Sequence, residues 1–290
     1  MTGAAGGAIL ARGGGQDGLA AAQGLLKFLG SEQRNQKGER MKLGLCSDIH
    51  VHRQDQTEEI RELIKHLNAH RDLDLLICAG DLSHHSAEVR TFLDSITLDC
   101  PRAWLPGNHD LWVIEAESES DRSDYRYRVM LPALSEAAGW HYLPSGPLSL
   151  AEGRIAVVGT TGWFTDPGYS EWFDAEADER DQDLATRFAS ELEQSIGAVE
   201  KSARLIVVTH HVPHPGCLPE RDPRRGEHSV RIAQVIARHA ERIELVAHGH
   251  KHRRYGPITI DGVRYIAHPF GYPGQHQGPE DGLRVVTLGG

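Results

Sequence analysis

One stretch decides how the chain is organised: Ala103-Trp104-Leu105-Pro106-Gly107-Asn108-His109-Asp110. Its first three residues are apolar and predict the end of a buried strand, and Pro106-Gly107 predicts a sharp turn. Asn108, His109 and Asp110 then present an amide oxygen, an imidazole and a carboxylate at consecutive positions. In open α/β sheets, ligands bind at the carboxyl ends of the strands. The alternative is a polar turn in which Asn108 caps a helix.

The composition is that of an ordinary globular protein. The 290 residues are 39% hydrophobic and 25% charged, which allows one large α/β domain or two small ones. No run approaches the roughly 18 apolar residues that a membrane span needs. The formal net charge of −10 argues against a broad nucleic-acid-binding surface, although bound divalent cations would create a local positive site.

The cysteines and histidines narrow the chemistry. Four cysteines, Cys46, Cys78, Cys100 and Cys217, lie far apart and form no CxxC pair, so a thiolate zinc site is not expected. We predict buried, reduced thiols in a cytoplasmic protein. Histidine is abundant, with 18 residues, and the positions of these residues carry more information than their number.

The first 40 residues differ from the rest of the chain. Residues 1–15 are mostly Gly and Ala and residues 32–40 are polar and charged, so neither segment offers a core. The apolar residues 8–10 are too few for a secretory signal, and a transit peptide is an alternative that the near absence of serine disfavours. We predict that residues 1–40 are a disordered extension or follow from a wrongly assigned start codon, and that residues 41–290 form one domain.

From residue 41 onward, short apolar runs alternate with helical segments, which is typical of an α/β sheet. The expected strands cover residues 42–46, 73–79, 103–105, 155–159, 205–209, 243–247, 257–260, 263–267 and 284–288. The expected helices cover residues 57–69, 86–96, 125–138, 181–199 and 230–239. Thr57 is expected to cap the first helix, and Asp261-Gly262 to form a hairpin turn.

Five of these strands end in residues of the kinds that bind metal ions. The endings are Asp48 with His50, Asp81, Asn108, His210, and His250 with His252. Turns and caps use Asp and Asn often. Five endings that carry Asp, Asn or His, and never Cys, are hard to obtain from turn chemistry alone. The set therefore predicts a metal or catalytic site.

These blocks, in their order along the chain, resemble the calcineurin-like metallophosphoesterase superfamily. They read Asp48-x-His50, Gly80-Asp81, Gly107-Asn108-His109-Asp110, His210 and Gly249-His250-x-His252. The resemblance implies an α/β fold, a four-layer α/β/β/α sandwich of two mixed β-sheets flanked by helices. It also implies two divalent or transition metal ions (Mn, Fe, Ni or Zn), which suit a mixture of oxygen and imidazole ligands.

The resemblance also implies a role for each block. The first metal ion would be held by Asp48, His50 and His252, the second by Asn108, His210 and His250, and Asp81 would bridge the two. Such a pair lowers the pKa of a bound water and clamps the attacking and leaving oxygens. We therefore expect metal-activated hydroxide to attack phosphorus without a phospho-enzyme.

Two residues of the third block fall outside the metal ligands. We assign His109 to the leaving-group side, as a general acid or as a cation that stabilises the transition state. Asp110 would orient His109 or cap a helix. The histidines beside the blocks are expected to surround the site rather than bind metal: His52, His84, His85, His211 and His248. No role is assigned to His214, His268 or His276.

The expected substrate is a small phosphodiester or phosphomonoester. Protein Ser/Thr phosphatases of the superfamily carry an acid and an Arg shortly after the Gly-Asp block, and the stretch 80–86, Gly-Asp-Leu-Ser-His-His-Ser, has neither. A nuclease using the same chemistry is disfavoured by the net charge, and a non-catalytic scaffold is disfavoured by the complete ligand set. The sequence leaves the oligomeric state open.

Two further groups of residues have two interpretations each. The basic residues Arg221, Arg224, Arg225, Lys251, Arg253 and Arg254 would grip a second phosphate or carboxylate, or would pair with acids on the surface. The aromatic residues Trp163, Phe164, Tyr169, Trp172 and Phe173 would stack on a nucleobase, or would pack in the core.

Overall fold

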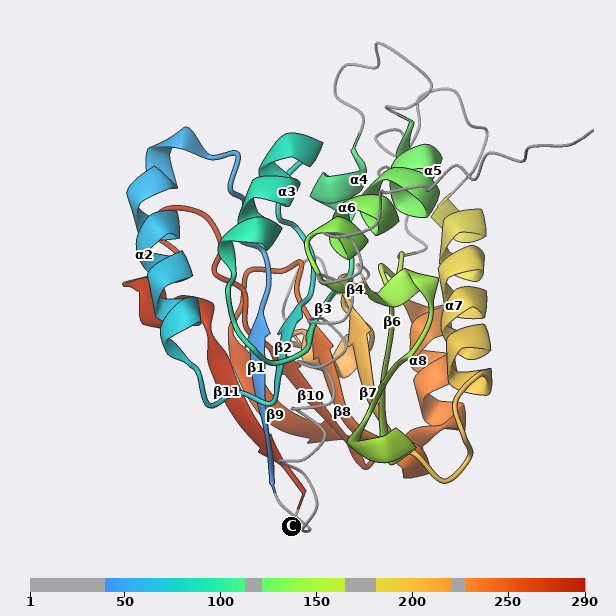
Figure 1. The fold of residues 1–290 in the computed structure, drawn as a ribbon. Coiled ribbons are helices and arrows are strands. Elements are labelled where there is room, and N and C mark those ends of the chain that lie inside the picture. The colour runs from blue at the N-terminus through green and yellow to red at the C-terminus, as the bar shows by residue number, and fades with distance from the viewer. Residues whose placement is uncertain (1–39, 113–121, 165–180, 221–227, 290) are drawn as a thin grey trace, which may run out of the picture. The chain divides into compact units, whose positions relative to one another are not determined.

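The computed structural model describes residues 40–112, 122–164, 181–220 and 228–289 (Figure 1). Several predictions lie outside these ranges. They concern the extension before Arg40, the aromatic residues Tyr169, Trp172 and Phe173, and the basic residues Arg221, Arg224 and Arg225.

The described strands form two mixed sheets. The first contains β1 (Met41–Cys46), β2 (Leu75–Cys78), β3 (Arg102–Trp104), β4 (His141–Tyr142) and β11 (Arg284–Leu288), in the order β11-β1-β2-β3-β4. The second contains β5 (Leu148–Leu150), β6 (Ile155–Thr160), β7 (Arg204–Thr209), β8 (Ile243–His248), β9 (Tyr255–Ile260) and β10 (Val263–Ala267), in the order β5-β6-β7-β8-β10-β9. The inner strands pair in parallel, whereas β11, β5 and β9 pair antiparallel with their neighbours.

Helices cover the outer face of each sheet. The main helices are α2 (Thr57–Ala69), α3 (Ser86–Ser95), α6 (Leu131–Ala137), α7 (Asp181–Gly197) and α8 (Val230–Arg238). Short helical turns are α4 (Asn108–Leu111), α5 (Ser123–Tyr125), η2 (Gln54–Gln56), η4 (Arg126–Met130), η5 (Leu143–Ser145), η6 (Ala151–Gly153), η8 (Pro215–Cys217), η9 (Ala240–Arg242) and η10 (Pro279–Gly282). Figure 1 shows the strands between α2 on one side and α7 and α8 on the other.

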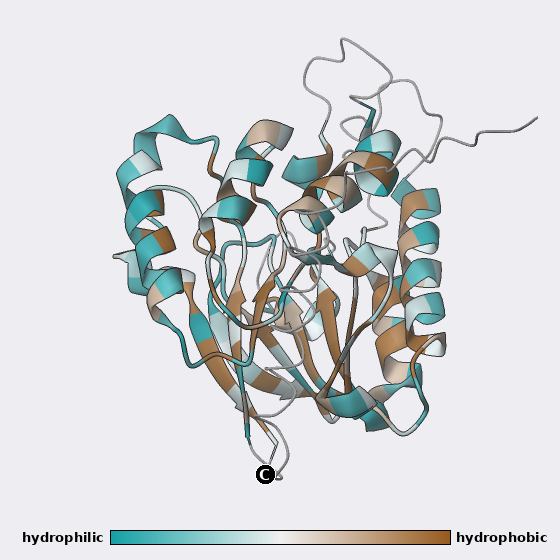
Figure 2. Ribbon diagram, viewed as in Figure 1, coloured by the Kyte–Doolittle hydropathy of each residue, from teal (hydrophilic) through white to brown (hydrophobic). Residues whose placement is uncertain are grey.

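Strand alternation creates the four layers. In β2, Leu75 and Ile77 pack into an apolar interior shared with Val157 and Ile206 of the second sheet, whereas the alternate residue Leu76 packs with α2 and α3. A third apolar cluster joins the outer face of the second sheet to α7 and α8. Brown hydrophobic ribbon is accordingly concentrated on the strands (Figure 2). The predicted four-layer α/β/β/α sandwich is confirmed.

Local details differ from the sequence predictions. Thr57 does not cap α2: it is the first helical residue, and its hydroxyl donates to the Gln54 carbonyl, because the preceding turn η2 already runs into the helix. The expected helix 125–138 is interrupted by the wide turn η4, where buried Arg126 donates to the carbonyls of Asp110 and His84. The short strands β4 and β5 were not expected. Among the described helices, none is long and apolar enough to cross a membrane.

Candidate metal centre

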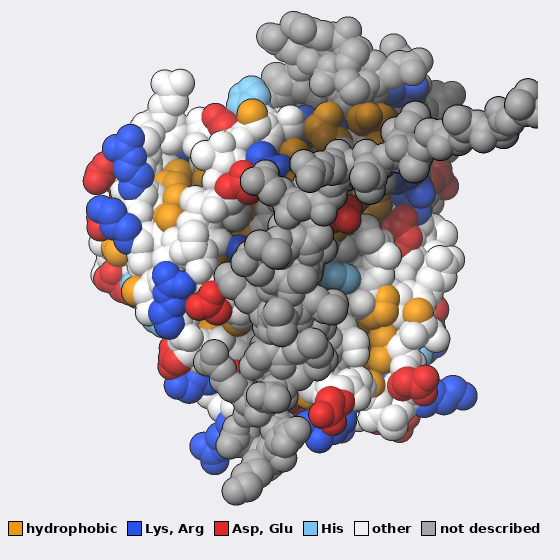
Figure 3. All heavy atoms as spheres, viewed as in Figure 1, with side chains coloured by type: hydrophobic (Ala, Val, Ile, Leu, Met, Phe, Trp, Pro, Cys, Tyr) orange, Lys and Arg blue, Asp and Glu red, His pale blue; other side chains and the backbone are white. Residues whose placement is uncertain are grey.

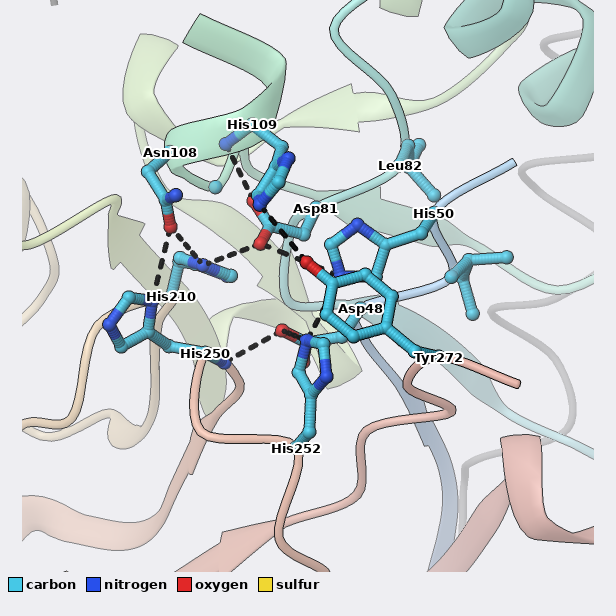
Figure 4. A network of polar contacts seen from close by, with 12 residues as sticks. Asp48, His50, Asp81, Leu82, Asn108, His109, His210, His250, His252 and Tyr272 are labelled. Carbon is cyan, nitrogen blue, oxygen red and sulfur yellow. Dashed lines mark hydrogen bonds and ion pairs between the residues drawn. The ribbon is translucent and has the colours of Figure 1, made fainter. Parts of the chain in front are cut away.

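Five strand ends bring the candidate residues together. In the first sheet, Cys46 is level with Cys78, and Cys78 is level with Trp104, so the loops after β1, β2 and β3 emerge at one edge. The loops after β7 and β8 emerge beside them, because the His210 ring lies 2.8 Å from the Ala79 carbonyl across the two sheets. Figure 4 shows the seven predicted ligands around one small volume, together with His109.

The backbone at these positions is unusual. Eight non-glycine residues among those described have positive φ, and five of them are predicted ligands: Asp48, His50, Asp81, His250 and His252. Left-handed backbone costs about 1 kcal/mol or more per residue and concentrates at functional sites. The fold holds these side chains in directions that a relaxed chain would not give them.

Two glycines allow the ligand loops to pack closely. A Cβ on Gly107 would lie 2.1 Å from Asp81 Oδ1, and a Cβ on Gly249 would lie 2.4 Å from Asp48 Oδ2. Both distances are far shorter than any real contact. The glycines in these two blocks therefore make room for carboxylates.

The second half of the centre consists of Asn108, His210 and His250. Asn108 Oδ1 lies 3.0 Å from His210 Nε2 and 3.1 Å from His250 Nδ1. The other ring nitrogen of His210, Nδ1, faces the Ala79 carbonyl and donates to it. In the neutral ring this bond leaves the lone pair on Nε2, the nitrogen that faces Asn108 Oδ1.

The first half consists of Asp48, His50 and His252. The Nε2 atoms of His50 and His252 lie 2.9 Å apart, and His252 Nε2 is 3.4 Å from Asp48 Oδ1. His252 Nδ1 lies 2.8 Å from Gln275 Oε1 and donates to it, so in the neutral ring Nε2 carries the lone pair. Asp48 Oδ2 is buried and has no hydrogen-bond partner among the described residues.

Asp81 lies between the two halves. Its Oδ2 is 3.3 Å from His210 Nε2 and 3.9 Å from His50 Nε2. Its Oδ1 accepts a hydrogen bond from the backbone N–H of His109 at 2.9 Å. This position between His210 and His50 suits a carboxylate that would be shared by two cations.

The electrostatics of the centre are dominated by burial and by Asp81. Burial alone would raise the pKa of Asp81, but His210, His109 and His50 outweigh burial and hold that pKa well below its usual range. Burial alone would lower the pKa of His210, but Asp81 and Asp48 raise it to about 9. Burial lowers the pKa of His50 to about 3. The metal-free centre therefore contains a buried Asp81–His210 ion pair, and a cation would displace the His210 proton.

The donor atoms fit metal ions. Oxygen and imidazole nitrogen atoms that bind one cation at about 2.1 Å lie about 3.0–3.4 Å apart, which matches the spacing in both halves. A buried carboxylate oxygen without a partner among the described residues, such as Asp48 Oδ2, is unfavourable unless a cation lies beside it. This mixture of oxygen and imidazole donors suits divalent or transition metal ions.

His109 lies beside the predicted ligands. Its ring centroid is 4.7 Å from that of His50 and 3.9 Å from that of Trp112. Its Nε2 lies 3.4 Å from the Tyr272 hydroxyl, and its Nδ1 is buried without a hydrogen-bond partner among the described residues. Burial lowers the pKa of His109, so the resting ring is neutral at pH 7.

The contacts of Asp110 are those expected of a helix cap, and not of a residue that orients His109. Its Oδ2 accepts from the backbone N–H groups of Gly107 and Asp81, and its Oδ1 accepts from those of Leu82 and Ser83, all at 2.8–2.9 Å. Burial first, and then the Asp81 charge, raises its pKa to about 7. The carboxylate ties the Asp81 loop to α4, so any effect of Asp110 on catalysis would act through Asp81.

The neighbouring histidines lie around the centre. His211 is buried against Trp163, Phe164 and His250. The His84 ring contacts those of His52 and His85 in tilted arrangements. His248 contacts the Tyr255 hydroxyl, His214 faces Asp261, and His276 stacks on Phe270. Two of the aromatic residues considered for stacking on a nucleobase lie in the described ranges, Trp163 and Phe164, and both are buried in the core.

Two residues at the site were not found by sequence reasoning. Tyr272 and Gln275 contact His109 and His252 respectively, yet neither is a usual metal ligand. Their only signal is the Gly-Tyr-Pro-Gly sequence of residues 271–274, which predicts a turn. Arg254, expected to bind a phosphate or to pair with an acid, lies 3.3 Å from Asp281 and donates to the carbonyls of Pro269 and Gln275.

Comparison with known proteins assigns the family. Residues 41–254 match the calcineurin-like phosphoesterases, while a search of curated proteins found no match. Among solved structures, phosphopantetheinyl hydrolase from Mycobacterium tuberculosis is 18% identical with a TM-score of 0.68, covering 86% of this chain and 96% of that one. A dimetal phosphatase from Danio rerio is 14% identical with a TM-score of 0.51, covering 78% of this chain and 86% of that one. These two likenesses concern the fold. The family match, over most of the chain, shows that the protein belongs to the calcineurin-like phosphoesterases and is a metal-dependent phosphoesterase.

Proposed function

We propose that the protein hydrolyses a small phosphate ester, a diester or a monoester, at a dinuclear metal centre, and that residues 41–290 form the catalytic domain. The observation that carries this proposal is the convergence of seven side chains from five strand ends, with Asp81 Oδ2 facing His210 on one side and His50 on the other. The set of predicted ligands is complete, which supports a catalytic role over that of a scaffold on the same fold.

The seven residues would divide between two cations. Asp48, His50 and His252 would hold one cation, Asn108, His210 and His250 would hold the other, and Asp81 would be shared. The cations, when bound, supply positive charge that lowers the pKa of water and offsets charge on the phosphoryl oxygens. Because the ligand set contains no Cys and no hard all-oxygen cage, we propose Mn, Fe, Ni or Zn.

His109 is proposed to act on the leaving-group side. Its backbone N–H is bonded to Asp81, which fixes the ring next to the shared carboxylate. A neutral imidazole offers one N–H donor, and Nε2 is the ring nitrogen that faces the site near Tyr272. This donor would hydrogen-bond to the departing oxygen as its negative charge develops.

Small substrates are favoured over nucleic acids. The net charge is −10, and on the face seen in Figure 3 the Lys and Arg side chains of the described residues are interspersed with Asp and Glu. Nucleic-acid binding relies on clustered positive charge. Arg254 is engaged by Asp281 and by two carbonyls. The four free cysteines are consistent with the proposed cytoplasmic location.

An activity screen tests this function. Protein stripped of metal and reloaded with Mn²⁺, Fe²⁺, Ni²⁺ or Zn²⁺ is assayed with para-nitrophenyl phosphate, its bis ester, cyclic nucleotides and a phosphopantetheinyl ester, the last because of the structural neighbour's name. Hydrolysis that requires metal is expected, and preference for the bis ester would identify a diesterase. Metal-loaded protein that cleaves none of these esters would contradict the proposal.

A further inference from the structure

The turn that follows β10 covers the first half of the metal centre. The ring of Tyr272 lies 4.6 Å from the His50 ring and 4.5 Å from the His252 ring, centroid to centroid. In Figure 4 the ring stands in front of His50, with its hydroxyl directed toward His109. The guanidinium carbon of Arg53 lies 5.3 Å from the centroid of the Tyr272 ring. The turn therefore forms a wall of the site.

The backbone of this turn is built onto a predicted ligand loop. Pro269 pairs with Ser47 in an isolated parallel bridge. The N–H of Phe270 donates to the Ser47 carbonyl and that of Gly271 donates to the Asp48 carbonyl, both at 2.9 Å. The position of Tyr272 is thus fixed relative to Asp48 before any side-chain contact is considered.

Gln275 links the turn to a second predicted ligand. Its Oε1 accepts from the Tyr272 backbone N–H at 2.7 Å and from His252 Nδ1–H at 2.8 Å. The backbone N–H of Gln275 donates to the Tyr272 carbonyl at 2.9 Å. One amide oxygen therefore both closes the turn and sets the tautomer of His252.

Two polar atoms from different parts of the chain meet on the leaving-group side. The Tyr272 hydroxyl and His109 Nε2 lie 3.4 Å apart, too far for a strong hydrogen bond to each other. That spacing allows one oxygen atom of a ligand to accept from both groups. A phenol hydroxyl is a donor at neutral pH.

We propose that Tyr272 is a further catalytic residue, whose hydroxyl donates to the leaving-group oxygen of the bound ester beside His109. Gln275 is its positioning residue, which holds the turn against His252. The inference rests on the proposed function and extends it to the group that departs. Such a bond strengthens as negative charge collects on the leaving oxygen, so its contribution depends on the leaving group.

The test compares Tyr272→Phe with wild type across esters of graded leaving groups. A hydrogen bond to a charged oxygen is worth about 1.5–3 kcal/mol, so kcat/KM for an alkyl ester should fall about 10- to 100-fold. For the para-nitrophenyl ester the loss should be under about 3-fold, because nitrophenolate disperses its charge. Tyr265→Phe, on the strand that leads into the turn, is the matched control. An equal loss on every ester would overturn the catalytic role.

Two binding measurements keep the inference separate from turnover. Tyr272→Phe should bind inorganic phosphate in the Mn²⁺-loaded protein as Tyr265→Phe does, because free phosphate has no leaving-group oxygen, and binding about 10-fold weaker would overturn a contact confined to the leaving group. Gln275→Leu should lower the affinity for one of two Mn²⁺ ions about 10- to 100-fold, as measured by calorimetry on the metal-free protein. Unchanged Mn²⁺ affinity would overturn the positioning role. Wild-type protein that binds phosphate but cleaves no ester would count against the proposed function alone.

Discussion

The two halves of the metal centre are held in place by different parts of the fold. In the second half, His210 is fully buried and donates to the Ala79 carbonyl, part of the sheet edge itself. In the first half, His252 is partly exposed and donates to Gln275, an exposed residue on a turn. The same chemical requirement, one ring nitrogen fixed so that the other can bind, is met by rigid backbone in one half and by a side chain in the other.

The difference predicts how each half responds to change. Backbone at a sheet edge moves only if the sheet moves, whereas a turn adjusts when its residues are substituted. The second half should therefore keep its geometry in most variants, while the first half should depend on the turn at residues 269–275. Asp81 faces both halves, so a substitution of Asp81 should affect both of them.

The largest effect is expected from Asp81→Asn. The substitution keeps the shape of the side chain and removes the charge shared by both cations, so bound metal should fall in both halves. Activity should fall at least about 10³-fold, since several kcal/mol of transition-state stabilisation depend on the pair. Metal content by mass spectrometry and kcat/KM check this, with the exposed Asp261→Asn as control. A variant that retains two metal ions would contradict a bridging role.

His109→Ala should separate chemistry from metal binding. We expect turnover to fall about 10²- to 10⁴-fold because the donor at the leaving oxygen is lost. Both halves should retain their cations, because His109 lies outside the predicted ligands. Metal analysis alongside kcat measures the two effects independently, and loss of metal would show that His109 is a ligand.

Gly271→Ala should affect the first half alone. A Cβ at this position would lie 2.7 Å from Gln275 Oε1, so the glutamine would be pushed away from His252. We expect about 10-fold weaker binding of one Mn²⁺ ion. Gly274→Ala is the matched control, since its φ of +84° is nearly that of Gly271 at +85° but nothing lies within 4 Å of its Cβ. Equal titrations for the two variants would remove the steric explanation.

The smallest effect is expected at an acid–imidazole pair outside the centre. Glu193 on α7 lies 2.6 Å from Arg238 and 2.8 Å from His239. Burial alone would raise the pKa of Glu193, but these partners outweigh burial and lower it. Because the side chain is 41% exposed, Glu193→Gln should cost at most about 0.5 kcal/mol of unfolding free energy.

The pH dependence of that cost follows from the lowered pKa. A carboxyl whose pKa is lower in the folded state stabilises the protein above its unfolded pKa of about 4.3, and this stabilisation is lost as the pH falls through the folded value. Urea unfolding at pH 7 and pH 3 should therefore show a difference between wild type and Glu193→Gln only at pH 7. A difference that grows at pH 3 would contradict this sign.

Much of the fold was predictable because its pattern is local. The alternation of apolar runs with helical stripes gave α2 with the bounds found, Thr57–Ala69, and placed β1 and β7 to within one residue. The strands β4 and β5 were missed because two or three residues carry too little periodicity. Thr57 was misassigned as a cap because the preceding turn η2 has no apolar pattern.

The sequence by itself determined which residue types stand at the strand ends, because hydrophobic periodicity marks where each strand stops and the polar residues that follow are then conspicuous. Only the tertiary structure decided which of these residues face the metal centre and which hold its loops in place. The left-handed backbone at five predicted ligands, the capture of Asp110 by four backbone amides, and the arrival of Tyr272 and Gln275 beside His109 and His252 all depend on contacts between distant segments. Such contacts leave no periodic signal, because the residues that make them are chosen by packing across two sheets rather than by their neighbours in the chain.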